Sequence, residues 1–220
     1  FEALTHAGVA NKVKIKADLI DATKIEDGSV KLNNYRGFVI PGGYGSRAVE
    51  GKIKAIQHSR ENNIPLLGIC YGFQLSIVEI ARNVLGWSDA NTTEISPDTK
   101  HPVIDLLPEQ KQIKNKGATN RLGAKKTLIE KGTMAFAMYK QENILKRFRH
   151  RWEMNPEYVE AMQGAGVVFS GIDESKTIKK VLELKNHPFF FGVQYHPEFD
   201  SRLEKPEESF AKLIEASKKC

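Results

Sequence analysis

The 220-residue sequence has few cysteines, since Cys70 and Cys220 are the only two. A disulfide framework is therefore not expected, and a reducing cytoplasm is the favoured location. The sequence also lacks any apolar run near the roughly 18 residues that a membrane helix needs. It begins without the basic and then apolar pattern of a secretory signal. We therefore expect a cytoplasmic protein that does not enter the membrane.

Positive charge exceeds negative charge, with 33 Lys and Arg against 27 Asp and Glu. Part of the excess lies in the stretch 111–126, and part in Arg147, Arg149 and Arg151. A solvated lysine-rich face, binding to nucleic acid, and attraction of acidic small molecules could each explain it. Nucleic acid is the least favoured partner, because no nucleic-acid-binding motif accompanies the charge.

Strands and helices alternate through the first part of the chain. Buried strands are predicted over 37–40 and 64–69, and helices over 49–62 and 71–85. This order is typical of a parallel sheet covered by helices. We therefore predict a three-layer α/β fold with a mostly parallel central sheet flanked by helices, formed as one domain over 1–220.

The remaining pattern is less regular, and the stretch 91–127 is broken by prolines and glycines into loops and short strands. Helices are predicted over 1–7 and after Pro206, strands over 13–20, 149–154 and 166–172, and a hairpin from 181–184 and 189–195. An apolar Phe1 inside a helix is an unusual start for a domain. We expect either a preceding strand or a longer parent polypeptide.

The strongest chemical signal is Cys70, which stands between a buried strand and a helix and has Gly68 and Gly72 two residues to either side. This spacing is that of a nucleophile elbow, a turn so sharp that a Cβ at either flank would clash. It would expose the sulfur at the carboxyl end of the sheet, where α/β proteins bind ligands. The helix N-terminus favours the thiolate. The alternative is an inert structural cysteine.

A second signal is His196-Pro197-Glu198, which follows an apolar strand. Proline keeps the preceding residue extended, and residues two apart on an extended chain point to the same side. Glu198 could therefore accept a hydrogen bond from His196 and fix its tautomer, as in a catalytic triad. A plain loop is the alternative for this tripeptide. The catalytic interpretation of His196 is favoured because, like Cys70, it lies at the end of a predicted strand.

A third signal is the glycine-rich segment 41–45, which follows another buried strand. It could be a simple flexible turn. It could also turn backbone N–H groups toward a substrate and stabilise the oxyanion of a tetrahedral intermediate. The N–H groups of Gly43 and of Tyr71, the residue after Cys70, are the candidates.

Together these motifs resemble the class I, triad-type glutamine amidotransferases, whose fold is flavodoxin-like. More narrowly, the sequence is similar to the glutaminase domains of the CTP synthase family. The similar stretches keep their order over nearly the whole chain: 37–53, 60–74, 81–94, 121–123, 149–156 and 187–199.

The resemblance implies Cys70 as the nucleophile, His196 as general base and acid, and Glu198 as the residue that orients His196. It implies a glutamine site without metal, formed by Gly43, Tyr71, Gly72, Phe73, Gln74, Glu94 and Arg151. Glu94 would bind the α-ammonium group of glutamine and Arg151 its α-carboxylate.

This sequence departs from the family pattern at four positions, one of which is Phe148, which interrupts a run usually richer in His. Tyr71 and Phe73 stand where Leu and Met are usual, and Trp152 stands where Tyr or Phe is usual. These changes keep the backbone donors, so we expect the chemistry to be retained with an altered pocket shape or rate.

The resemblance also implies a larger reaction. Ammonia would pass to an N-terminal amidoligase domain, absent from this chain, which uses ATP and Mg to convert UTP to CTP. GTP would act as an allosteric activator, with the basic loop 111–126 closing over the site or meeting the nucleotide, and the full-length protein would be a homo-oligomer.

Two alternatives remain at this point. Another amidotransferase subunit or a γ-glutamyl peptide hydrolase could use the same scaffold, and a non-catalytic domain could use it only to dock a partner or bind nucleotide. The complete set of Cys70, His196 and Glu198 argues against the non-catalytic alternative.

Overall fold

A computed structural model describes residues 1–107, 110 and 120–219. Most of the basic stretch 111–126, including Lys111, Lys114 and Lys116, lies outside the described residues, and so does Cys220. Within the described part of the chain, none of the helices has the length and apolarity needed to cross a bilayer.

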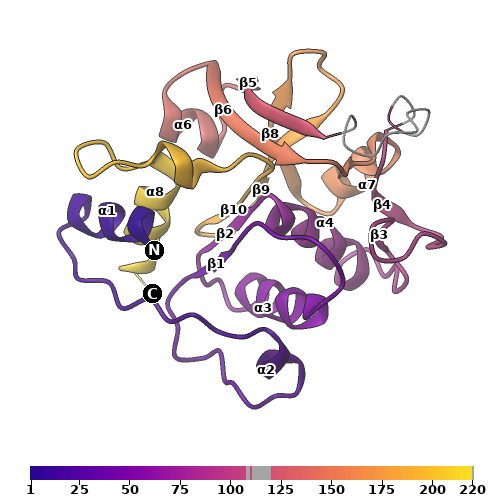
Figure 1. Cartoon of the computed structure of the whole chain (residues 1–220), viewed down its shortest axis with the longest axis horizontal. Helices are drawn as coiled ribbons and strands as arrows, with labels where there is room; N and C mark the ends of the chain where they lie inside the picture. Colours follow the sequence, from indigo (N-terminus) through magenta and orange to yellow (C-terminus); the bar gives the residue numbers. More distant parts are fainter. Residues whose placement is uncertain (108–109, 111–119, 220) are drawn as a thin grey trace.

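A seven-stranded sheet forms the centre of the molecule (Figure 1). In spatial order its strands are β1 (Phe38–Ile40), β2 (Leu66–Ile69), β10 (Phe190–Val193), β9 (Lys179–Leu184), β8 (Val167–Asp173), β5 (Arg121–Ile129) and β6 (Asn143–His150). A small second sheet joins β3 (Asn91–Thr92), β4 (Pro102–Asp105) and β7 (Glu153–Met154).

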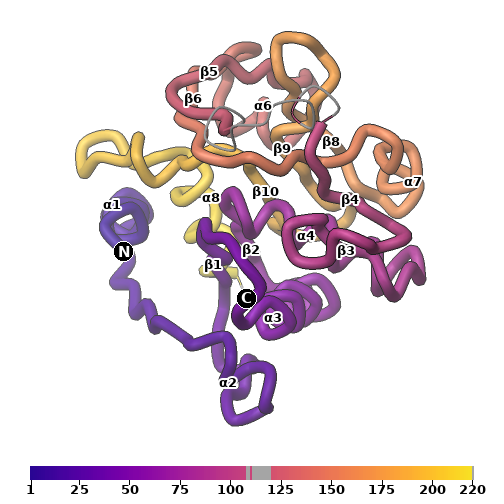
Figure 2. Tube along the Cα trace, turned by 45° about the vertical axis from the view of Figure 1, so that its right-hand side comes forward, coloured from indigo at the N-terminus to yellow at the C-terminus, as the bar shows by residue number. Residues whose placement is uncertain are grey.

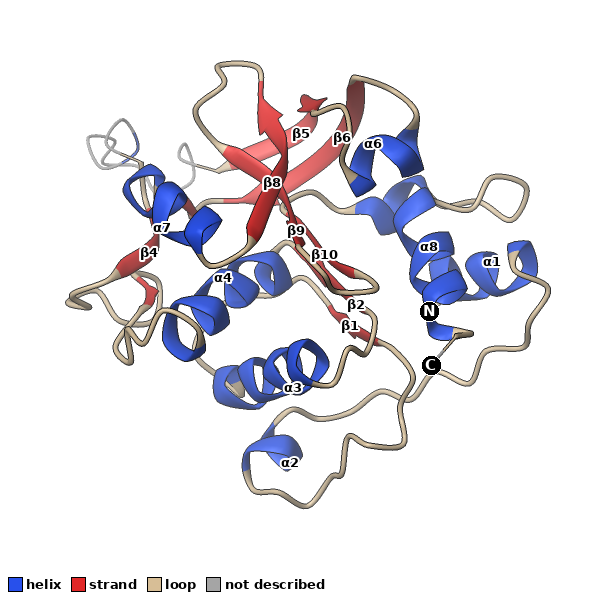
Figure 3. Ribbon diagram, turned by 180° about the vertical axis from the view of Figure 1, so that it is seen from behind, coloured by secondary structure: helices blue, strands red, loops and turns tan. Residues whose placement is uncertain are grey.

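Helices cover both faces of the parallel strands, so the predicted three-layer α/β architecture is confirmed (Figure 3). The helices are α1 (Glu2–Ala10), α2 (Thr23–Glu26), α3 (Val49–Glu61), α4 (Tyr71–Asn83), α6 (Met134–Tyr139), α7 (Val159–Gly164) and α8 (Glu208–Ser217), with short 3-10 turns η2 (Pro156–Tyr158) and η3 (Pro197–Asp200). α3 and α4 lie on one face. α1 and α8, from opposite ends of the chain, lie side by side on the other (Figure 2).

The alternation of side chains along β2 divides the core into two parts. Leu66 packs into the cluster under α3 and α4, whereas Leu67 and Ile69 pack into the cluster under α1 and α8. All four residues of β2 are buried. A strand buried on both faces has the continuous apolar sequence that made β2 predictable.

The central sheet is mixed, which corrects the prediction of a mostly parallel sheet. β1 pairs parallel to β2, and β2 parallel to β10. The pairings from β10 through β9, β8 and β5 to β6 are antiparallel. Short connections reverse the chain direction between β8 and β9 and in the predicted hairpin of β9 and β10. β5 and β6 are joined through α6, and β5 pairs with β8 from a distant part of the chain.

Two predicted strands differ from the structure. The segment 13–20 forms no strand, because no neighbouring strand pairs with it among the described residues, and Leu19 is 85% exposed. The predicted strand 149–154 is divided between the end of β6 at His150 and the separate β7. Arg151 and Trp152 fall in the break between the two sheets. Helix α1 runs past Gly8 to Ala10, with Gly8 packed against Ile15.

Candidate active site

The turn at Cys70 has the geometry of a nucleophile elbow. Cys70 has φ of 52° and ψ of −96°, a conformation that a residue with a side chain rarely adopts. A Cβ added to Gly72 would lie 2.2 Å from the carbonyl oxygen of Ile40, and one added to Gly68 would lie 2.9 Å from the backbone of Gly72. Both glycines are therefore required by close backbone packing between β1, β2 and α4.

His196 lies beside Cys70 because β2 and β10 are adjacent parallel strands, with Ile69 in register with Val193. A Cβ added to Gly42 would lie 2.8 Å from Cε1 of His196 and 3.6 Å from Cβ of Cys70. Gly42 thus leaves free the space beside both side chains that any larger residue would fill. The structure brings together two residues that are more than a hundred positions apart in the sequence.

The imidazole of His196 is held on one side by Glu198, whose Oε1 is 2.7 Å from Nδ1. Burial disfavours the charged ring, but interactions with Cys70 and Glu198 outweigh burial and raise the pKa of His196 to about 9. Nε2 is buried and forms no hydrogen bond of standard geometry within the described residues. Hydrogen bonding to the Cys70 thiol and the charge of the sulfur both contribute to the raised pKa of His196, so the sulfur lies within reach of the ring.

The glycine-rich segment 41–45 lies against the N-terminus of α4. A Cβ at Gly43 would lie 3.5 Å from Cδ1 of Tyr71. The Tyr71 hydroxyl donates a hydrogen bond to the carbonyl oxygen of Gly45 at 2.5 Å, and the Gly45 N–H donates to Oε1 of Glu94 at 3.1 Å. The two candidate oxyanion donors, Gly43 and Tyr71, are therefore neighbours in space.

Glu94 and Arg151 lie close enough for their charges to interact. Burial raises the pKa of Glu94, while the hydrogen bond from Gly45 and the charge of Arg151 oppose that rise. The guanidinium of Arg151 lies 5.3 Å from the ring centre of Trp152, and its Nε donates to Oδ1 of Asn120 at 3.3 Å. One acidic and one basic group thus share this end of the site, as binding of an amino acid requires.

The other predicted glutamine-binding residues are largely enclosed by protein. Phe73 has no exposed surface and belongs to the core, so it contributes to this region through packing. Gln74 is buried, and its Nε2 donates to the carbonyl oxygen of Trp152 at 2.8 Å and to Oε1 of Gln194 at 3.2 Å. Gly72 supplies the close approach at the elbow.

Two residues near the sulfur were missed in the sequence. Gln194 is fully buried, and its Nε2 lies 3.6 Å from Sγ of Cys70. Gly42 faces His196 and Cys70, as described above. A signal for Gln194 was present, because it stands two positions before His196, and alternate residues of an extended segment share a side.

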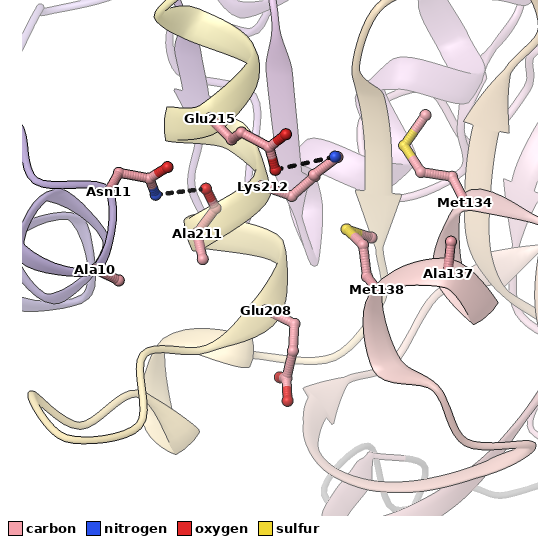
Figure 4. Close-up of a pocket in the computed structure, with 9 residues that line it drawn as sticks. All are labelled: Ala10, Asn11, Met134, Ala137, Met138, Glu208, Ala211, Lys212 and Glu215. Carbon is pink, nitrogen blue, oxygen red and sulfur yellow. Dashed lines mark hydrogen bonds and ion pairs between the residues drawn. The ribbon is translucent and has the colours of Figure 1, made fainter.

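A hollow of about 380 Å³ between α1, α6 and α8 lies elsewhere (Figure 4). Its lining includes Asn11, Met134, Met138 and Lys212, and none of the predicted site residues. It offers neither a cysteine nor a histidine, so we place the candidate active site at Cys70 on the chemistry of its groups.

A model of the glutamine amidotransferase class-I family matches residues 1–216. The chain belongs to this family. The CTP synthases of Pyrococcus abyssi and Pyrococcus furiosus are each 50% identical over 220 residues, which is 99% of this chain and 41% of each relative. The chain therefore spans about two fifths of the length of the curated relatives it matches.

A solved structure narrows the assignment within the family. The glutaminase domain of Trypanosoma brucei CTPS, with bound acivicin, is 31% identical with a TM-score of 0.93 over 99% of this chain and 86% of that one. The chain is thus a glutaminase domain of the CTP synthase type. A glutamine amidotransferase from Thermotoga maritima, at 13% identity and a TM-score of 0.56, is similar in fold alone.

Proposed function

We propose that this chain hydrolyses L-glutamine to glutamate and ammonia with Cys70, His196 and Glu198 as its catalytic triad. The observation that carries the proposal is the placement of a cysteine at a strained elbow beside a histidine that Glu198 holds at 2.7 Å. A pKa of about 9 for His196 keeps the ring protonated beside the sulfur at neutral pH. Such a pair favours the reactive thiolate.

The proposed reaction has two halves. The Cys70 thiolate attacks the side-chain amide carbon, and the N–H groups of Gly43 and Tyr71 stabilise the oxyanion that forms. The C–N bond then breaks as His196 gives its proton to the leaving nitrogen, which releases ammonia and leaves a glutamyl thioester. His196 next takes a proton from water, and the resulting hydroxide attacks the thioester to release glutamate and the thiolate.

The glutamine itself would be held at its amino-acid end. Glu94 is suited to the α-ammonium group and Arg151 to the α-carboxylate, because each offers the opposite charge. Gly72, Phe73 and Gln74, in the first turn of α4, complete the predicted binding set; they are buried and would support the pocket by packing.

The larger reaction is also a proposal, since the chain covers only 41% of the CTP synthases that it matches. We propose that the ammonia passes to an amidoligase domain outside this chain, which uses ATP and Mg to convert UTP to CTP. GTP would activate the glutaminase, and the basic stretch 111–126, which includes Arg121, is the candidate contact.

The test is Cys70→Ala, assayed for ammonia release with the synthase domain and GTP present. We expect glutaminase activity to be lost, while Cys220→Ala, the matched control, retains it. A glutamine-like electrophile should label Cys70 and spare Cys220 by peptide mass spectrometry. Ammonia release by Cys70→Ala would overturn the mechanism. Faster cleavage of a γ-glutamyl peptide than of glutamine would indicate a hydrolase of longer substrates.

A further inference from the structure

Tyr71 has a side chain that the triad mechanism does not use. The residue is 1% exposed, and its hydroxyl donates to the Gly45 carbonyl oxygen at 2.5 Å. Its own backbone N–H is a candidate oxyanion donor at the start of α4. One residue therefore connects the nucleophile elbow to the glycine-rich segment. The family pattern has Leu at this position, and Leu offers no donor.

Both backbone polar groups of Gly45 form hydrogen bonds to side chains. Its carbonyl oxygen accepts from Tyr71, and its N–H donates to Oε1 of Glu94 at 3.1 Å. Gly45 has φ of +76°, a left-handed conformation with little steric restraint in a glycine. The two hydrogen bonds therefore restrain a residue whose backbone is intrinsically free, and they link Tyr71 to Glu94 through the single residue Gly45.

The ring of Tyr71 supports the same segment. A Cβ added to Gly43 would lie 3.5 Å from Cδ1 of Tyr71, and Nζ of Lys52 lies 5.3 Å from the centre of the Tyr71 ring. Burial and the nearby charge of Glu94 raise the pKa of Tyr71 above its ordinary value. The phenol therefore stays protonated and remains a donor throughout the neutral range.

We infer that Tyr71 is a positioning residue that fixes the segment 41–45, and with it the N–H of Gly43 and the carboxylate of Glu94, relative to Cys70. The inference rests on the proposed glutaminase function and goes beyond it, because it gives the hydroxyl of Tyr71 a role in placing the oxyanion donor. An oxyanion donor is effective only when it is held at the position where charge develops. Loss of one hydrogen bond of this kind corresponds to roughly a 2- to 10-fold loss of rate.

The test is Tyr71→Phe, which removes only the hydroxyl, in the protein with its synthase domain and GTP. Two rates are compared: glutamine hydrolysis, which needs the oxyanion donors, and alkylation of Cys70 by iodoacetamide, which needs the thiolate but no oxyanion. We expect kcat/KM for glutamine to fall about 2- to 10-fold, with alkylation within about twofold of wild type. A change confined to folding or to the sulfur would move both rates together.

The matched control is Tyr158→Phe, which removes the hydroxyl of a half-buried tyrosine that packs against Trp87. It should change neither rate. Tyr71→Leu, which installs the usual family residue, is the second variant and should reproduce the selective loss if Tyr71→Phe is poorly folded.

Each outcome decides the inference. Unchanged hydrolysis in Tyr71→Phe, or an equal fall in both rates, would overturn the positioning role while leaving the triad intact. Absence of glutaminase activity in the wild-type protein would instead overturn the proposed function, and the inference with it.

Discussion

The two halves of the central sheet hold the site by different means. In the parallel half, β2 and β10 are buried at every residue. In the antiparallel half, β6 alternates strictly between exposed and buried residues, and much of β5 is exposed. The parallel half positions Cys70 and His196 through close backbone packing that glycines permit. The antiparallel half positions the segment around Arg151 through buried charges.

The buried charges converge on Glu153, which is fully buried. Nζ of Lys180 lies 2.7 and 2.8 Å from its two carboxylate oxygens, Nε2 of His150 lies 2.8 Å from Oε1, and Nε of Arg121 lies 3.6 Å from Oε1. Four strands thus meet at one carboxylate. The parallel half therefore depends on close backbone packing, and the antiparallel half on the balance of its buried charges.

The most severe test of the shape-dependent half is Gly72→Ala. A new Cβ would lie 2.2 Å from the carbonyl oxygen of Ile40, so α4 and the elbow must shift. Because a misplacement near 1 Å can cost about 100-fold in rate, we expect at least that loss of glutaminase activity. Gly164→Ala in α7 is the control, since nothing lies within 4 Å of its Cβ position. Activity of Gly72→Ala near the wild-type rate would show that backbone closeness is not what holds Cys70.

The charge-dependent half is tested by Glu153→Gln. The substitution preserves shape but removes the carboxylate that pairs directly with the buried ammonium of Lys180, and breaking a buried pair in this way typically costs about 3–5 kcal/mol of unfolding free energy. Denaturant titration at neutral pH measures the loss. Glu174→Gln is the control, because Glu174 is exposed and its pair with Lys126 at 3.7 Å is worth under about 1 kcal/mol. Equal stability of the two variants would contradict the distinction between the halves.

Lowering the pH should reduce the stability that Glu153 contributes to the antiparallel half. Burial opposes ionisation of Glu153, but the charges of His150 and Lys180 and their hydrogen bonds prevail and lower its pKa to about 2. A carboxyl with a depressed native pKa stabilises the fold above its unfolded pKa of about 4.5 and loses that contribution as pH falls toward 2. The stability difference between wild type and Glu153→Gln should therefore shrink over this range. A difference that is constant between pH 5 and pH 2 would rule out this origin.

A smaller effect is expected at His196 in the parallel half. Its pKa of about 9 depends partly on Cys70, so Cys70→Ala should lower it toward the ordinary value near 6.5. NMR titration of the imidazole resonances measures the change, with His101 of the same sample as an internal reference. Because the native pKa is raised, the associated stability is complete below about pH 6.5 and is lost as pH rises through 9. An unchanged His196 pKa in Cys70→Ala would mean that Glu198 alone raises it.

The smallest effect is expected on the exposed face of β5. Lys125 is exposed, and replacing it with Ser should change the unfolding free energy by no more than about 0.5 kcal/mol. Thermal unfolding measures the change. A larger loss would mean that the antiparallel half depends on its surface charges as well as on Glu153.

The structure was easier to predict from the sequence in the parallel half of the sheet than in the antiparallel half, because local residue types determine the first and contacts between distant residues the second. The apolar runs of β1 and β2, the helices after them and the glycines around Cys70 carry their conformation in local residue types, and each was predicted close to its observed bounds. Around Arg151, the prediction of one continuous strand was wrong, because the break follows from membership of two different sheets. The segment 13–20 has the alternation of a strand but lacks a neighbour to pair with.

The sequence by itself determined which groups can react: a cysteine at an elbow, a histidine two positions before a glutamate, and glycines where backbones must meet. These follow from steric and chemical properties of neighbouring residues. Only the tertiary structure decided that Gln194 lies beside the sulfur, that Tyr71 and Glu94 hydrogen-bond to the same residue, Gly45, and that side chains of three other strands converge on Glu153. Such contacts join residues that are distant along the chain, and their geometry depends on how strands pair and which way each runs.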